Sequence, residues 1–163
     1  MTTQQSAPRR NVVVGVDGSP SSLDALRWAA CMAVPLNAEI DAVTSWAYPA
    51  SYGMGGGAPV EWDPVEDAAQ ILADALTAAF GDHRPVGIRA VVREGHPAEV
   101  LSDASIGAEM LVVGSRGHGG FAGLLLGSVS AYCSAHAGCP VLVTRTTPPT
   151  SARPVGVDMQ APS

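Results

Sequence analysis

The chain has 163 residues and 47% apolar composition, which suffices to bury one hydrophobic core. Its formal charge is −6, and all nine basic residues are arginines scattered along the chain, so neither a basic nucleic-acid-binding patch nor any lysine-dependent site is expected. No apolar stretch has the length of a membrane span, and no apolar signal region follows the amino terminus. The three cysteines are an odd number without a C-x2-C pair, which favours a reducing compartment. We therefore expect a cytoplasmic protein without nucleic-acid or membrane partners.

Residues 1–10 are polar and predict a disordered tail. The valine-rich run from Asn11 to Val16 predicts a buried parallel strand. A helix should follow, with Ser19 as its cap and Pro20 at its first position, where a missing amide costs nothing. We expect this helix to end before Pro35, because proline disfavours the helical conformation of the residue before it.

The middle of the chain alternates between strand and helix patterns. Its expected elements are a strand over Glu39–Trp46, an irregular loop over Tyr48–Asp63, a helix over Pro64–Phe80, a strand over Gly87–Arg93 and a helix over Ala98–Ser105. The loop is long for a connection in a compact domain, and such loops are often functional.

The last part begins with an apolar strand over Met110–Val113, followed by a loop with six glycines. A helix is expected from Ser128 to Ala137 and a final strand from Pro140 to Arg145. Residues 146–163 are polar and proline-rich and predict a second disordered tail.

This alternation predicts one α/β domain over residues 11–145. It should be a three-layer sandwich, with a mostly parallel five-stranded sheet and helices on both faces. In such sheets ligands bind beyond the carboxyl ends of the strands, where the strand order reverses. Asp17 follows the first strand, and the loop from Gly114 to Gly117 follows the fourth. A carboxylate beside a phosphate-binding loop can hold ribose hydroxyls or the water on a divalent metal ion.

A strand, a glycine-rich turn and a helix N-terminus together are typical of an anion site. Here Gly114, Gly117, Gly127 and Ser128 form the pattern G-x2-G-x9-G-S. This pattern resembles the nucleotide-binding signature of the ATP-binding universal stress proteins. The segments VVVGVDGSPSSLDALRWAA and REGHPAEVL resemble the opening and middle parts of that family.

The resemblance implies a Rossmann-like fold that binds ATP or a related adenine nucleotide. It implies that Asp17 meets the ribose or a Mg²⁺ ion carried by the nucleotide, and that Ser45 offers its backbone to adenine. The chain has Thr44-Ser45-Trp46 where the family often has His-Ala-Trp. Ribose and phosphates would be surrounded by Gly114, Gly117, Gly127, Ser128, Val129 and Ser130. By charge, Arg116 is a better phosphate partner than His118, which we expect to be a solvated loop residue.

Two classes of function fit these residues. The first is a nucleotide-binding regulatory protein in which the nucleotide changes a dimer that a protein partner recognises. The second is an ATPase or a nucleotidyl transferase that uses the same loop. No obvious set of acid, base and nucleophile is present, which favours binding over catalysis. The residues leave open whether the ligand is ATP, ADP or a cyclic nucleotide, and which partner and signal are involved.

The final strand suggests how a dimer would form. The residues from Pro140 to Thr144 include no lysine, no interior proline and no charge before Arg145, so the usual protection of a sheet edge is absent. We expect two copies of this strand to pair in antiparallel fashion across a two-fold axis.

Overall fold

The computed structural model describes residues 9–48, 63–118 and 125–146. Most of the expected tails, most of the Tyr48–Asp63 loop and Gly119, Gly120 and Gly123 lie outside the described residues. Arg9 and Arg10, which belong to the first expected tail, are described and form ion pairs with Glu39 and Glu109. The elements are β1 (Asn11–Gly15), α1 (Pro20–Leu36), β2 (Glu39–Trp46), α2 (Pro64–Phe80), β3 (Ile88–Glu94), α3 (Pro97–Ala104), β4 (Met110–Gly114), α4 (Ser128–His136) and β5 (Val141–Thr144). Their order is the expected one, and most of the ends differ from the expected positions by no more than a residue.

The five strands form one parallel sheet in the order β3-β2-β1-β4-β5. β1 lies at the centre, where Val14 is in register with Ala42 of β2 on one side and Val112 of β4 on the other. The chain first moves outward from β1 through β2 to β3 and then returns to the other side of β1 with β4. The strand order therefore reverses between β1 and β4, and this reversal marks where a ligand site is expected.

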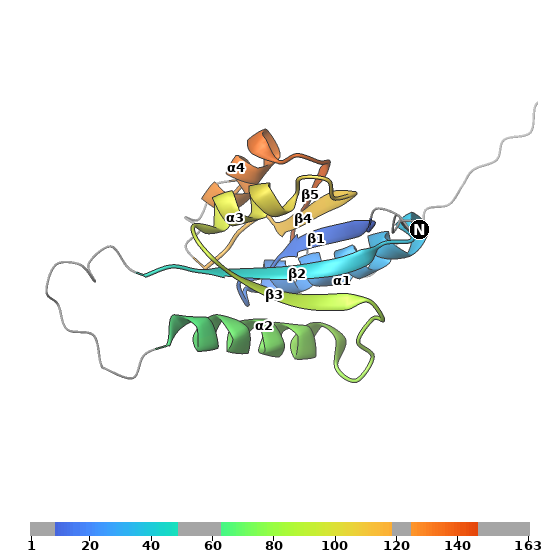
Figure 1. The fold of residues 1–163 in the computed structure, drawn as a ribbon, viewed down its shortest axis with the longest axis horizontal. Helices are drawn as coiled ribbons and strands as arrows, with labels where there is room; N and C mark the ends of the chain where they lie inside the picture. Colours follow the sequence, from blue (N-terminus) through green and yellow to red (C-terminus); the bar gives the residue numbers. More distant parts are fainter. Residues whose placement is uncertain (1–8, 49–62, 119–124, 147–163) are drawn as a thin grey trace, which may run out of the picture.

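Helices cover both faces of the sheet (Figure 1). Val12 and Val14 of β1 pack in one core with buried residues of α1 and α2. Val13 points to the opposite face and packs in a second core with α3 and α4. Successive side chains of a strand alternate between faces, so a central strand covered on both faces must be apolar throughout.

The first helix begins as expected and ends later than expected. The Ser19 side chain accepts a hydrogen bond from the Ser22 amide. However, α1 continues through Pro35, so the predicted end was wrong. Pro35 lies in the last turn, where its missing amide costs only one hydrogen bond. Asn37, with φ 48°, ends the helix in the left-handed conformation, and the Ala38 amide donates to the Ala33 carbonyl.

Candidate functional site

A cleft of about 440 Å³ opens at the carboxyl ends of β1 and β4, where the strand order reverses. Every site residue expected from the sequence lines it. These are Asp17, Ser45, Gly114, Arg116, Gly117, Gly127, Ser128, Val129 and Ser130. They come from four separate segments, and the parallel sheet brings them to one edge.

Asp17 is held by the turn that leads into α1. Its Oδ1 atom accepts hydrogen bonds from the Ser19 amide at 2.9 Å and from the Ser19 hydroxyl at 2.5 Å. Its Oδ2 atom faces Gly117, where a Cβ would lie only 2.7 Å away. Gly18 adopts φ +80°, a left-handed conformation that permits this tight turn. One carboxylate oxygen is thus fixed by the turn, and the other faces the glycine loop.

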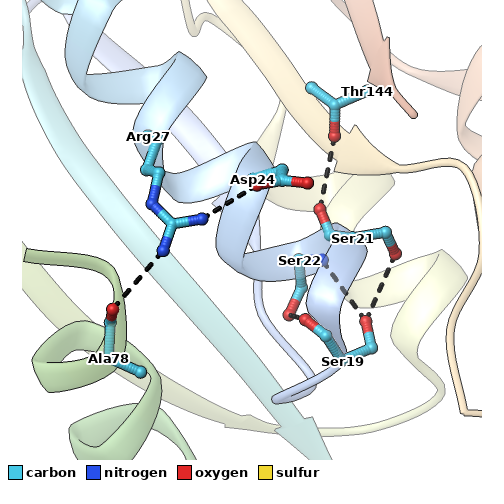
Figure 2. A network of polar contacts seen from close by, with 7 residues as sticks. All are labelled: Ser19, Ser21, Ser22, Asp24, Arg27, Ala78 and Thr144. Atoms are coloured by element: carbon cyan, nitrogen blue, oxygen red, sulfur yellow. Dashed lines mark hydrogen bonds and ion pairs between the residues drawn. The ribbon is translucent and has the colours of Figure 1, made fainter. Parts of the chain in front are cut away.

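The first turn of α1 is fixed against the ends of β4 and β5. The Thr144 hydroxyl donates to the Ser21 carbonyl at 3.3 Å, as Figure 2 shows. The Ser21 hydroxyl in turn donates to the carbonyl of Arg116. Helix α1 therefore positions the loop that follows β4.

The N-terminus of α4 opens onto the cleft. Gly127 occupies the N-cap position with φ −72° and has no side chain to accept from the first helical turn. The Gly127 carbonyl accepts from the Ala131 amide at 3.0 Å, and the amides of Ser128, Val129 and Ser130 have no acceptor among the described residues. Unpaired first-turn amides and the positive end of the helix dipole favour an anion here.

Backbone contacts hold this helix in place. The Gly127 amide donates to the Ser115 carbonyl at 2.7 Å. The Ser130 hydroxyl is buried and donates to the carbonyls of Gly127 and Ser115, at 3.0 and 3.2 Å. The loop is thus closed by hydrogen bonds between its two ends.

The cleft also has an apolar lining, and the sequence analysis missed these residues. They are Val16 after β1, Val43 of β2, Ile71 of α2, Pro97 and Leu101 of α3, and Val113 of β4. Thr44 adds a hydroxyl that donates to the Val16 carbonyl at 2.9 Å. Only the packing of α2 and α3 on the sheet reveals that these positions share a cavity with the glycine loop.

His118 lies exposed in its loop, as expected, and it also contacts the turn after β1. Its Nε2 atom lies 2.8 Å from the Asp17 carbonyl, an acceptor, and its ring lines the cleft. The contact joins the loop after β4 to the turn after β1. The packing of the two loops determines this contact, so the sequence of either loop alone does not predict it.

The described residues contain no group of three or more His, Cys, Asp or Glu side chains that could by itself hold a metal ion. In the same part of the chain, no helix has the length and apolar character required to cross a bilayer.

The parallel sheet, its covered faces and the cleft at the strand reversal define a Rossmann-like α/β protein. Residues 8–145 match the model of the universal stress protein family, and the chain belongs to this family. Universal stress protein Rv2623 of Mycobacterium tuberculosis is 36% identical over 146 residues, which make up 89% of this chain and 47% of that protein. Universal stress protein Mb2019 of Mycobacterium bovis is 35% identical over 141 residues, 85% of this chain and 44% of that protein. The chain spans about half the length of these relatives.

Solved structures agree with this assignment. A universal stress protein in complex with cAMP is 30% identical, with a TM-score of 0.58 over 86% of this chain and 100% of that chain. Universal stress protein UspA from Lactobacillus plantarum, 22% identical, has a TM-score of 0.64 over 86% of this chain and 100% of that chain, and shares the fold.

Proposed function

We propose that this protein binds adenine nucleotides, ATP foremost, and that it acts as a regulatory stress-response protein. The observation that carries the proposal is the α4 N-terminus, whose first-turn amides have no acceptor among the described residues and face a cleft lined by every predicted site residue. A family relative that is 30% identical forms a complex with cAMP, which supports an adenine nucleotide as the ligand class.

The two halves of the cleft suit the two ends of a nucleotide. The apolar part around Val43 and Leu101 fits a heterocyclic base, with the Ser45 backbone beside it. The phosphates would be bound by the first-turn amides of α4 and by the backbone around Gly117. Both ends are thus recognised mainly by backbone and apolar surface.

Asp17 would lie between these two ends. Its Oδ2 atom has no partner among the described residues and faces the glycine loop. A carboxylate oxygen suits a ribose hydroxyl and also suits Mg²⁺, which usually binds through one or two carboxylates together with ligand phosphates. The chain would thus supply one oxygen to a magnesium ion that the nucleotide carries.

The regulatory part of the proposal involves the open edge of the sheet. β5 is an edge strand, and pairing it with β5 of a second copy would give a two-fold homodimer. Nucleotide bound beside the ends of β4 and β5 would then alter a surface that an unidentified cytoplasmic partner recognises.

Titration calorimetry with ATP, ADP, AMP and cAMP tests the proposal, together with mass spectrometry of any nucleotide that co-purifies with the native protein. We expect Gly117→Val to lose ATP binding, because its side chain would fill the space between the loop and Asp17. Ala135→Val, which places the same side chain on the exposed part of α4, serves as the control. If the wild-type protein binds none of the four nucleotides, the proposal is wrong.

A further inference from the structure

A second cavity, of about 480 Å³, lies beside the cleft. It is bounded by the start of α1, by the loop after β4 and by the chain that follows β5. Ser19, Ser21, Arg116 and Gly117 line both cavities. Arg145 lines only the second one, which we call the arginine pocket. Because the two cavities share these residues, the arginine pocket adjoins the cleft.

The two charged side chains that line the arginine pocket are both cationic, Arg116 and Arg145, although the chain as a whole carries a net charge of −6. Asp17 lines the first cavity and does not line the second. Arg145 forms no ion pair with any residue in the described part of the chain. This arrangement favours an anion.

The sheet determines why the two arginines meet. The Ser115 amide donates to the Thr144 carbonyl at 2.7 Å, which joins the ends of β4 and β5. Arg116 and Arg145 are the residues that directly follow this hydrogen-bonded pair. The first turn of α1 fixes the same region. The Ser21 carbonyl accepts from the Thr144 hydroxyl (Figure 2), and the Ser21 hydroxyl donates to the Arg116 carbonyl. The backbones of both arginines are therefore anchored on rigid elements.

Two of the three serine hydroxyls that line the pocket already have protein acceptors. The Ser19 hydroxyl donates to Asp17, and the Ser21 hydroxyl donates to the Arg116 carbonyl. The Arg145 guanidinium, which has no ion pair in the described part of the chain, can donate to a ligand, and its planar fork suits the oxygens of a phosphoryl group.

We propose that the arginine pocket binds the outer phosphoryl groups of a ligand whose nucleoside part occupies the cleft. The protein would then select its ligand by the length and charge of the phosphate chain. This inference rests on the proposed nucleotide binding, and the experiment below separates the two.

The test compares AMP, ADP, ATP and inorganic tripolyphosphate by titration calorimetry at fixed ionic strength, because salt screens exposed charges. The variants are Arg145→Gln and Arg145→Lys. Arg84→Gln is the matched control, since it removes the same charge from an exposed site in the segment between α2 and β3. We expect Arg145→Gln to weaken ATP and tripolyphosphate binding about tenfold, the value of one charge-assisted hydrogen bond. AMP binding should change less than about twofold, and Arg145→Lys should recover part of the loss.

The outcomes are distinguishable. Equal ATP affinities in Arg145→Gln and Arg84→Gln would overturn the arginine pocket and leave nucleotide binding intact. An equal loss of AMP and ATP affinity in Arg145→Gln would also overturn it, because the arginine would then act on the whole site. Tripolyphosphate binding that depends on Arg145, with no binding of any adenine nucleotide, would support the pocket and contradict the proposed nucleotide function.

Discussion

Ser21 and Gly114 meet where the first turn of α1 crosses the end of β4. A Cβ on Gly114 would lie 2.5 Å from the Ser21 Oγ atom and 2.8 Å from its carbonyl carbon. Neither Gly114 nor Gly117 adopts a positive φ, so these motif glycines provide room for neighbouring atoms. At Gly117 the neighbour is different, because its Cβ would meet only the end of the Asp17 side chain.

This difference predicts different outcomes for two identical substitutions. Gly114→Ala should destabilise the protein by about 1–3 kcal/mol, because the helix backbone at Ser21 must shift to admit the methyl group. Gly117→Ala should cost less stability than Gly114→Ala, because only the end of the Asp17 side chain and no helix backbone must shift, but should weaken ATP binding. Urea unfolding and calorimetry measure the two effects. Equal free energies of unfolding for the two variants would contradict this explanation.

Asp17→Ala should weaken ATP binding about tenfold in the presence of magnesium, a loss typical of one hydrogen bond to a charged group. Repeating the titration with a chelator identifies the cause. If the carboxylate acts through a metal ion, the loss disappears without magnesium, whereas equal losses in both conditions indicate a direct ribose contact. Asp24→Ala, which removes a carboxylate paired with Arg27 on α1, is the control. Unchanged ATP affinity in Asp17→Ala would mean that Asp17 only stabilises the turn and does not bind the nucleotide.

The dimer prediction depends on which backbone groups of β5 are free. β5 pairs with β4 on one side only. The Pro140 carbonyl accepts from the Leu111 amide, and the Thr144 carbonyl accepts from the Ser115 amide. Because backbone direction alternates along a strand, Val141 and Val143 turn their amides to the open edge.

Val143→Pro should therefore abolish the dimer and leave the β4–β5 pairing intact, since it removes an amide that β4 does not use. Val143→Ala keeps the amide and should remain dimeric. Light scattering at micromolar concentration distinguishes the states. A wild-type mass near the monomer value of 16.6 kDa would rule out the homodimer.

The three cysteines should differ in reactivity. Burial raises the pKa of the Cys133 and Cys139 thiols. At pH 8 these two thiols therefore carry less of the reactive thiolate than an ordinary cysteine does, and the thiolate fraction increases as the pH rises. Cys31 lies exposed on α1. Alkylation with iodoacetamide, followed by peptide mass spectrometry, should label Cys31 first, and Cys31→Ser should remove the fast phase. Labelling of Cys133 at the rate of Cys31 would contradict the burial of Cys133.

The sequence by itself determined the order of the elements. Apolar runs such as Asn11 to Val16 are long enough for strands that are buried on both faces, and periodic segments between them are long enough for crossover helices. The spacing from Gly114 to Ser128 also located the glycine loop that lines the cleft and the helix after it. These signals are local, so a single sequence contains them. The rule that a helix ends before a proline gave the wrong end for α1, because a proline in the last turn removes only one hydrogen bond.

Only the tertiary structure decided which residues share the site. Ile71 and Leu101 lie on helices that pack on opposite faces of the sheet, and nothing in their own segments indicates that they line one cleft. The contact of His118 with Asp17 joins residues 101 positions apart, and Arg145 approaches Arg116 only because β4 and β5 are neighbours. Strand order and helix packing arise from contacts between distant segments, and these contacts created the arginine pocket beside the cleft.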